Sequence, residues 1–274
     1  FISVRGNKLA LLIAFFLLSV QLIFRHSSYS IDLTDEHSVK YSFKVLSINV
    51  GQFSNDTAAV NQCIELIRSE KLDVVCLQEF GLYYKWPDVE SVVSDFAKRT
   101  DFQYYDFSPK QGNIFGTAVF SKHEITHIDT IFQLLSHTNE AKVYKLDVNG
   151  KSISIANVHL QSYNLFSSSD SLSWHSIQRA IADRNEQVKM ILRSQPDIVL
   201  GDFNASPGTI VHSMLCAEYI DVQHSFGKAF SPTYKDFPTR LDYLFVNGSF
   251  APKSFYLNPI PPSDHKALVA QIGI

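Results

Sequence analysis

Short apolar runs bordered by polar residues recur along this chain, and they constrain its fold more than any other feature. Each run has the length and composition of a buried β-strand, whereas the polar residues beside it contribute nothing to the packing of a core. The pattern occurs at Ser47-Ile48-Asn49, Leu77-Gln78-Glu79, Asn157-Val158-His159, Gly201-Asp202-Phe203-Asn204, Arg240-Leu241-Asp242-Tyr243 and Ser263-Asp264-His265.

Stretches between these runs have the spacing of amphipathic helices. Asn55 or Asp56 can cap the first of them, and Pro196 closes the last. The helices are predicted over residues 56–70, 88–99 and 174–193. Many short strands with a few interposed helices predict an α/β or α+β fold with extensive sheet. Because open sheets gather ligand sites at their strand ends, the polar segments are the candidates for a functional site.

Size and composition set limits on the class of protein. The 274 residues suit one large domain or two small ones, and 45% are hydrophobic, enough for a sizeable core. With a formal charge of −3, the chain is not a strongly basic protein of the class that coats nucleic acid. A locally basic cleft is still compatible with this net charge. Cys63, Cys76 and Cys216 match no zinc spacing, and we expect all three in the core.

Residues 9–24 (LALLIAFFLLSVQLIF) form an uncharged run of 16 residues. A spanning helix needs about 20 apolar residues, and the stems of Lys8 and Arg25 can extend the run by reaching toward the interface. The run is apolar on all sides, and no small-x-small cleavage site follows it. We therefore expect a membrane helix rather than a signal peptide or a core helix.

The chain is accordingly divided into three parts by the sequence. Residues 1–26 are expected to anchor the chain in a lipid bilayer, residues 27–41 to form a polar linker, and residues 42–274 to form the catalytic domain. Arg5 and Lys8 precede the apolar run and Arg25 follows it. This small excess of positive charge favours a cytoplasmic N-terminus and an exported catalytic domain.

Four acidic residues of the polar segments would repel one another if the fold brought them together. They are Glu79, Asp202, Asp242 and Asp264. A hard divalent cation resolves that conflict, and carboxylate and amide oxygens suit Mg²⁺ or Mn²⁺ better than zinc. Histidines nearby would supply groups for proton transfer. Oxygen ligands combined with histidine are suited to splitting a phosphate ester with water.

The order and wording of these segments resemble the endonuclease/exonuclease/phosphatase superfamily over about residues 44–272. The resemblance rests on VLSINV, DVVCLQE, GTAVFSK, IANVHL, IVLGDFNASP, RLDYLFV and PPSDHKALVAQI. It implies a four-layer sandwich, in which two mixed β-sheets pack face to face and helices cover the outside. It departs from the family at Ile48, where Tyr or Trp is frequent, and at Lys266-Ala267, where an aromatic residue or Pro is common.

On the metal side, the resemblance assigns Glu79 as the principal Mg²⁺ ligand, with help from Asn49. Asp264 would line the metal site. Asp202 would orient or deprotonate the attacking water.

On the phosphate side, the resemblance implies that Asn204 holds the scissile phosphate and that His265 contacts it, oriented by Asp242. His159 would stabilise charge or assist the leaving oxygen. We add Arg240 as a candidate phosphate contact.

The substrate is left open by the sequence: a phospholipid headgroup, an inositol phosphate or a nucleic acid would each suit this chemistry. A Mg²⁺-dependent nuclease is therefore an alternative, and an inactive membrane-bound binding domain is a third. No obligate protein partner is evident. For Arg184 and Gln187, on the long helix before Asp202, a solvated helix face is favoured over a position facing the substrate cleft. The polar loop over residues 163–173 is expected to shape substrate choice.

Overall fold

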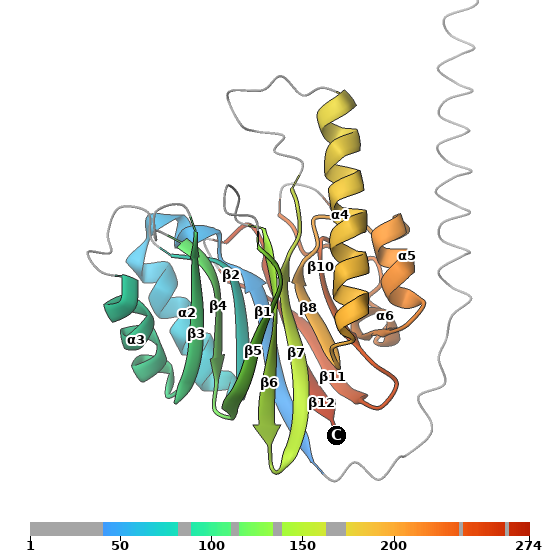
Figure 1. Cartoon of the computed structure of the whole chain (residues 1–274). Helices are drawn as coiled ribbons and strands as arrows, with labels where there is room; N and C mark the ends of the chain where they lie inside the picture. The colour runs from blue at the N-terminus through green and yellow to red at the C-terminus, as the bar shows by residue number, and fades with distance from the viewer. Residues whose placement is uncertain are drawn as a thin grey trace, which may run out of the picture. The chain divides into compact units, whose positions relative to one another are not determined.

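Two six-stranded β-sheets lie face to face in the computed structural model of the chain (Figure 1). The structure describes residues 41–81, 89–110, 115–133, 139–162, 174–235, 238–260 and 263–274. In strand order, the first sheet contains β11 (Ala251–Pro259), β12 (Lys266–Gly273), β1 (Ser42–Asn49), β2 (Val74–Gly81), β4 (Phe115–Ser121) and β3 (Tyr104–Lys110). The second contains β5 (Glu124–Gln133), β6 (Glu140–Val148), β7 (Lys151–His159), β8 (Ile198–Asp202), β10 (Asp242–Val246) and β9 (Ile220–Asp221).

Both sheets are mixed. β1 pairs in parallel with β2 and antiparallel with β12. β7 pairs in parallel with β8, which is antiparallel to β10. Parallel neighbours end at the same edge of a sheet, so β1 and β2 end together in the first sheet, as do β7 and β8 in the second.

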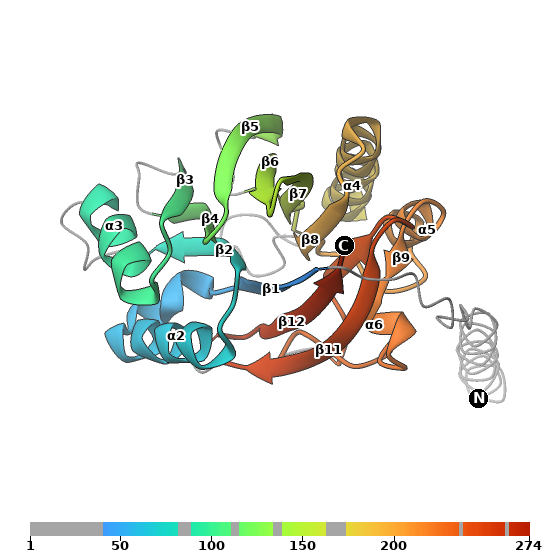
Figure 2. The ribbon, with the colours of Figure 1, turned by 90° about the horizontal axis from the view of Figure 1, so that it is seen from below.

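Helices cover the outer faces of the sandwich (Figures 1 and 2). Hydrophobic residues of α2 (Thr57–Glu70) and α3 (Val89–Thr100) pack on the first sheet. Those of α4 (Trp174–Ser194) and α5 (Ile210–Cys216) pack on the second. The structure also describes the short helices η1 (Gly51–Asn55) and α6 (Val222–Ser225). The layers therefore run helix, sheet, sheet, helix, as the resemblance implied.

Strand β1 shows why the strand segments of this sequence are continuously apolar instead of alternating with polar residues. Phe43 and Val45 pack between the sheets, whereas Leu46 and Ile48 pack beneath the helices. Side chains alternate between the two faces of a strand, and here both faces are buried. A strand of this kind has no polar face.

The predicted helices are present with small shifts of their ends, and Asp56 caps α2 by accepting from the amide of Ala58. The prediction that all three cysteines are core residues was wrong for Cys216, which is exposed at the end of α5. Residues 9–24, with the membrane prediction, and the loop over residues 163–173 lie outside the described residues. Within the described ranges, no helix has the length and apolar character to cross a membrane.

Candidate active site

Alternation along four strands brings the predicted site residues onto one surface. In β7, Ile153 and Ile155 face the other sheet, so Asn157 and His159 do so as well. The same alternation places Asn49 of β1, Asp202 of β8 and Asp242 of β10 on the inner face of their sheets. His159 and Asp242 each lie in register with Asp202. Asn49, His159, Asp202 and Asp242 therefore meet at one end of the sandwich.

Asp202 lies at the centre of this cluster and is only 2% exposed. Its Oδ2 accepts from Asn49 Nδ2 at 3.1 Å and lies 3.8 Å from His159 Nε2 and 3.9 Å from His265 Nε2. Its Oδ1 accepts from the backbone amide of Asn204 at 2.9 Å. One oxygen of the Asp202 carboxylate thus faces an amide and two imidazoles. The other oxygen accepts from the backbone, which fixes the orientation of the carboxylate.

Glu79 reaches the cluster from a distorted strand. The register between β2 and β4 shifts between Leu77 and Phe80, and Glu79 adopts a φ of +50°. A left-handed backbone is strained for a residue other than glycine, and such strain concentrates at functional sites. The Glu79 carboxylate accepts from Asn49 Nδ2 at 3.3 Å and lies 3.8 Å from His159 Nε2. Its side chain is 28% exposed, whereas Asn49 and His159 are buried.

His159 is buried, and its Nε2 faces both Glu79 and Asp202. Its Nδ1 has no hydrogen-bond partner among the described residues. Deeper in the sandwich, Gln78 Nε2 donates to Asn157 Oδ1 at 2.7 Å, and Asn157 Nδ2 donates to the carbonyls of Leu77 and Ala118. This buried amide pair fastens β2 to β7 and thereby fixes the spacing between Glu79 and His159.

His265 forms an ion pair with Asp242, through Nδ1 at 2.8 Å from Oδ2. Burial opposes the charged form of the imidazole, but the carboxylates of Asp242 and Asp202 outweigh it and raise the pKa of His265 to about 10. Burial also raises the pKa of Asp242, an effect that the His265 cation opposes. His265 is therefore a cation at neutral pH and points Nε2 toward Asp202.

Ser263 ties this pair to the first sheet, a role that the sequence did not reveal. Its hydroxyl donates to the carbonyl of Asn49 at 2.7 Å and accepts from the backbone amide of His265 at 3.0 Å. The Thr233 hydroxyl similarly accepts from the amide of Asp242. The serine of Ser-Asp-His thus positions the histidine against the end of β1.

Replacing Asp242 with Asn is expected to lower the pKa of His265 toward or below the ordinary value near 6.5. Burial still lowers this pKa, and the imidazolium has lost the carboxylate that raised it most. In the wild-type protein the raised pKa stabilises the fold fully below about pH 6.5, and this contribution disappears as the pH rises through about 10. In Asp242→Asn, where the folded and unfolded pKa values of His265 become similar, this contribution should be small at every pH. An NMR titration of the His265 ring in both proteins measures the shift, and an unchanged pKa would contradict it.

Side-chain amides and the buried guanidinium of Arg184 hold the chain just after His159. The carbonyl of Leu160 accepts from Asn204 Nδ2 at 3.0 Å and from Asn139 Nδ2 at 2.6 Å. The backbone amide of Gln161 donates to Gln187 Oε1 at 3.0 Å, and the backbone carbonyl of Gln161 accepts from Arg184 Nη1 at 2.8 Å.

The expectation that Arg184 and Gln187 lie on a solvated helix face was therefore wrong. Both are buried on the inner side of α4, where backbone groups of the segment after His159 require partners. The helical spacing of the apolar residues also predicts Ile181 on the buried face of α4, but it is 38% exposed.

Arg240 has a different environment from the one predicted. Its guanidinium is 1% exposed, binds both oxygens of Asp221 and stacks on the ring of Tyr243 at 4.2 Å. His212 Nε2 also contacts Asp221, at 3.1 Å. Because Asp221 and Tyr243 enclose the guanidinium, this geometry does not support Arg240 as a phosphate contact and indicates that it holds β10 to the segment around Asp221.

The donor chemistry beside Glu79 fits a hard divalent cation. Asp242, His265 and Asp202 gather their polar atoms within 4.8 Å of one another, but there the His265 cation already offsets the two carboxylates. Glu79 has no such cation within the described part of the chain. Asp264, one residue before His265, approaches from the side of Gly51, with its Oδ1 3.5 Å from the place that a Cβ would occupy. Asn49 turns its amide nitrogen toward Glu79 and its Oδ1 toward the amide of Gly51, so half a turn of that amide would present an oxygen ligand.

Comparison with solved structures shows the same fold in several proteins. An endonuclease/exonuclease/phosphatase family protein from Leptotrichia buccalis is 19% identical, with a TM-score of 0.63 over 85% of this chain and 100% of that chain. The human Nocturnin catalytic domain with bound sulfate is 19% identical, with a TM-score of 0.63 over 85% and 93% of the two chains. TDP2 from D. rerio, complexed with a single-strand DNA product, is 16% identical, with a TM-score of 0.64 over 86% and 100%.

No curated protein matches this chain. A family model, described as the Endonuclease/Exonuclease/phosphatase family, matches residues 46–265. That match spans the described site residues from Asn49 to His265, and the fold agrees with it. The chain belongs to the endonuclease/exonuclease/phosphatase family.

Proposed function

We propose that this chain is a divalent-cation-dependent hydrolase that splits a phosphate ester with water. The observation that carries the proposal is the environment of Asp202, whose carboxylate faces two imidazoles and the amide of Asn49 beside the more exposed Glu79. A charged, fixed carboxylate next to a cationic histidine can take a proton from water while the histidine holds an anion.

Mg²⁺ or Mn²⁺ would be held by Glu79 and Asp264, with Asn49 as a further ligand, and would supply positive charge to a phosphoryl oxygen. Asp202 orients the attacking water and accepts its proton. His265, kept protonated by Asp242, donates a hydrogen bond from Nε2 to a phosphoryl oxygen. His159 offers Nε2 on the other side of Asp202, where it stabilises charge or assists the leaving oxygen.

Asn204 completes the phosphate side of the site. One N–H of its Nδ2 donates to the carbonyl of Leu160, which leaves the second N–H of the same amide for a phosphoryl oxygen. The left-handed backbone of Asn204, with a φ of +48°, places this side chain beyond the end of β8. In this arrangement Asn204 positions the substrate next to Asp202.

The substrate class is a phosphodiester or phosphomonoester. Phospholipid headgroups, inositol phosphates and nucleic acids are all candidates, and the DNA product bound to TDP2 makes a nuclease the second candidate function. The net charge of −3 weighs against a general nucleic-acid surface. We further propose that residues 9–24 anchor the protein in a bilayer, with the catalytic domain on the exported side.

Hydrolysis should require a divalent cation. The full chain, purified in detergent, would be assayed against bis(p-nitrophenyl) phosphate, p-nitrophenyl phosphate, single-stranded DNA, sphingomyelin and a phosphoinositide. We expect turnover in Mg²⁺, its loss in EDTA, and recovery when Mg²⁺ is returned in excess. Full activity in EDTA would rule out the role given to Glu79, and DNA cleavage alone would select the nuclease.

A further inference from the structure

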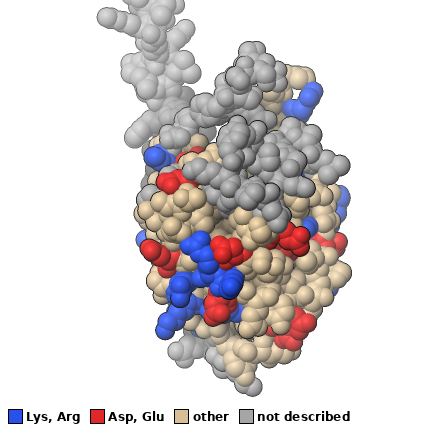
Figure 3. Space-filling model, turned by 90° about the vertical axis from the view of Figure 1, so that its left-hand side faces the viewer, with Lys and Arg blue, Asp and Glu red and all other residues tan. Residues whose placement is uncertain are grey.

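A cluster of cations lines a hollow of about 430 Å³ far from the active site. We call it the basic patch, and define it as Arg68, Lys71, Lys98, Arg99 and Lys122. All five residues are exposed; Asp101 lines the same hollow, and Asp73 lies 4.0 Å from Lys122. Figure 3, which shows the left-hand side of the view in Figure 1, has a group of Lys and Arg side chains in its lower half, with Asp and Glu side chains beside them. A protein with a net charge of −3 thus concentrates positive charge in one place.

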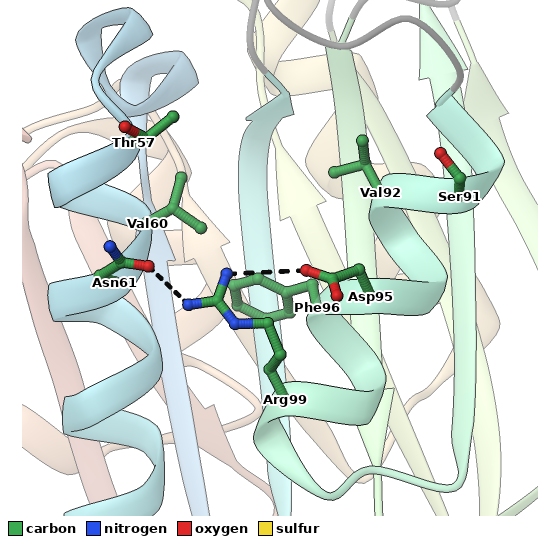
Figure 4. Close-up of a pocket in the computed structure, with 8 residues that line it drawn as sticks. All are labelled: Thr57, Val60, Asn61, Ser91, Val92, Asp95, Phe96 and Arg99. Carbon is green, nitrogen blue, oxygen red and sulfur yellow. Dashed lines mark hydrogen bonds and ion pairs between the residues drawn. The ribbon is translucent and has the colours of Figure 1, made fainter.

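Three separate segments build the basic patch. Arg68 and Lys71 lie at the end of α2, Lys98 and Arg99 in the last turn of α3, and Lys122 between β4 and β5. Arg99 is held by Asn61 of α2 and by Asp95 of α3 (Figure 4). This contact joins the two helices, so the surrounding cations are carried on a fixed surface.

The basic patch lies at the end of the first sheet opposite the active site. Lys71 shortly precedes β2, and Lys122 follows β4, whose Ser121 pairs with Val74 at the start of β2. Glu79 lies five residues further along β2, which is roughly 16 Å at 3.3 Å per residue. The domain also begins at this end, where Ser42 opens β1 and the carbonyl of Tyr41 accepts from Ile274.

Compensation of helix dipoles explains only part of this arrangement. Cations near the last turns of α2 and α3 are favourable because carbonyls end there, but Lys122 belongs to neither helix. The same carbonyls disfavour a small anion seated deep in the hollow. Long, exposed side chains instead suit negative charge that is spread over a plane outside it.

We propose that the basic patch is a docking surface for anionic lipid headgroups of a bilayer. It lies at the end of the domain where β1 begins, and in the sequence residues 25–41 join β1 to the apolar run over residues 9–24. The catalytic cluster then faces away from that bilayer. If the proposed hydrolysis is correct, on which this consequence rests, the substrate is a phosphate ester in solution rather than a lipid of the same membrane.

Local protection of lysines tests the docking, because the apolar run would bind the full chain to any bilayer. The full chain in vesicles of phosphatidylcholine, with or without phosphatidylglycerol, would be acetylated and mapped by mass spectrometry. We expect Lys71, Lys98 and Lys122 to be labelled several-fold more slowly in the anionic vesicles, with the difference lost at high salt. Lys189, exposed on α4 across the sandwich, should be labelled equally in both. Equal labelling of all four lysines would overturn the proposal.

A charge-removing variant gives a second measurement. Each cation near an anionic surface contributes roughly a fivefold gain in partition, so in a chain that the apolar run does not already hold to the bilayer, Lys71→Gln/Lys98→Gln/Lys122→Gln should reduce binding to anionic vesicles by about 10²-fold. If the full chain does not insert into phosphatidylcholine vesicles, co-sedimentation with anionic vesicles measures this loss of binding directly. Lys189→Gln is the matched control.

Two further outcomes separate the alternatives. Protection of the three lysines by inorganic phosphate alone, without vesicles, would show a small-anion site and overturn docking on a bilayer. Hydrolysis of a soluble ester by the triple variant should equal that of the wild type, because none of its residues lies in the catalytic cluster. A protein that docks but hydrolyses nothing would leave the docking surface intact and reject only the proposed function.

Discussion

Replacing Asp202 with Asn is expected to lower kcat/KM for phosphate-ester hydrolysis by about 10²- to 10⁴-fold, the range for losing a positioned general base. The carboxamide oxygen of the new side chain can still accept from the amide of Asn204 or from Asn49, so the geometry of the cluster should survive. The variant loses the charge that draws a proton from water and that helps to keep His265 protonated. The rate should therefore fall mainly in kcat, which steady-state kinetics with a soluble diester would measure.

Stability separates this catalytic effect from a folding defect. Asp202 repels Asp242 but attracts the His265 cation, so the two effects of removing its charge oppose each other. We therefore expect the free energy of unfolding of Asp202→Asn to stay close to that of the wild type. Asp129→Asn, on the exposed part of β5, is the matched control and should change neither rate nor stability. Near-normal activity in Asp202→Asn would remove Asp202 from the mechanism.

Replacing Gln187 with Met is expected to lower kcat by up to about 10²-fold, although Gln187 belongs to α4 and not to the catalytic cluster. The change leaves the buried amide of Gln161 without its acceptor, which costs roughly 1–3 kcal/mol. The segment after His159 can then shift, and a displacement of about 1 Å in a reacting group can cost about 10²-fold in rate. Both His159 and Asn204, which donates to the carbonyl of Leu160, would lose their positions.

Conservative variants distinguish positioning from a general loss of stability. Gln187→Glu keeps an oxygen acceptor and should restore most of kcat, whereas Lys189→Met, two residues along the same helix and exposed, should leave both rate and stability unchanged. A positioning role predicts that kcat falls more than KM rises, with the loss persisting well below the melting temperature of the variant. If Gln187→Met loses stability but keeps its kcat, Gln187 supports the fold alone.

Much of the active site could be read from the sequence because its members are marked by local rules. Short apolar runs predict strands, alternation assigns each side chain to a face, and polar residues at strand ends have no packing role. These rules brought out Asn49, His159, Asp202 and Asp242, which the structure brings together with Glu79 and His265 at one end of the sandwich. The family resemblance supplied the layered fold and the pairing of Asp242 with His265.

Other features depend on segments that are distant in sequence, and only the tertiary structure decided them. The sequence suggested Arg240 as a phosphate contact, whereas the structure places Asp221, 19 residues away in the chain, beside its guanidinium. Gln187 and Arg184 were expected on a solvated helix face, because nothing near them in the sequence shows that the backbone of Gln161 requires hydrogen-bond partners.

The bulge at Glu79 and the link through Ser263 likewise arise from register and packing between strands. The sequence by itself determined which chemical groups the chain carries and on which strand faces they lie. Packing of the two sheets and the helices decided which of those groups pair with one another and which face a substrate, because a buried charge or amide takes whatever partner the fold places within hydrogen-bond distance.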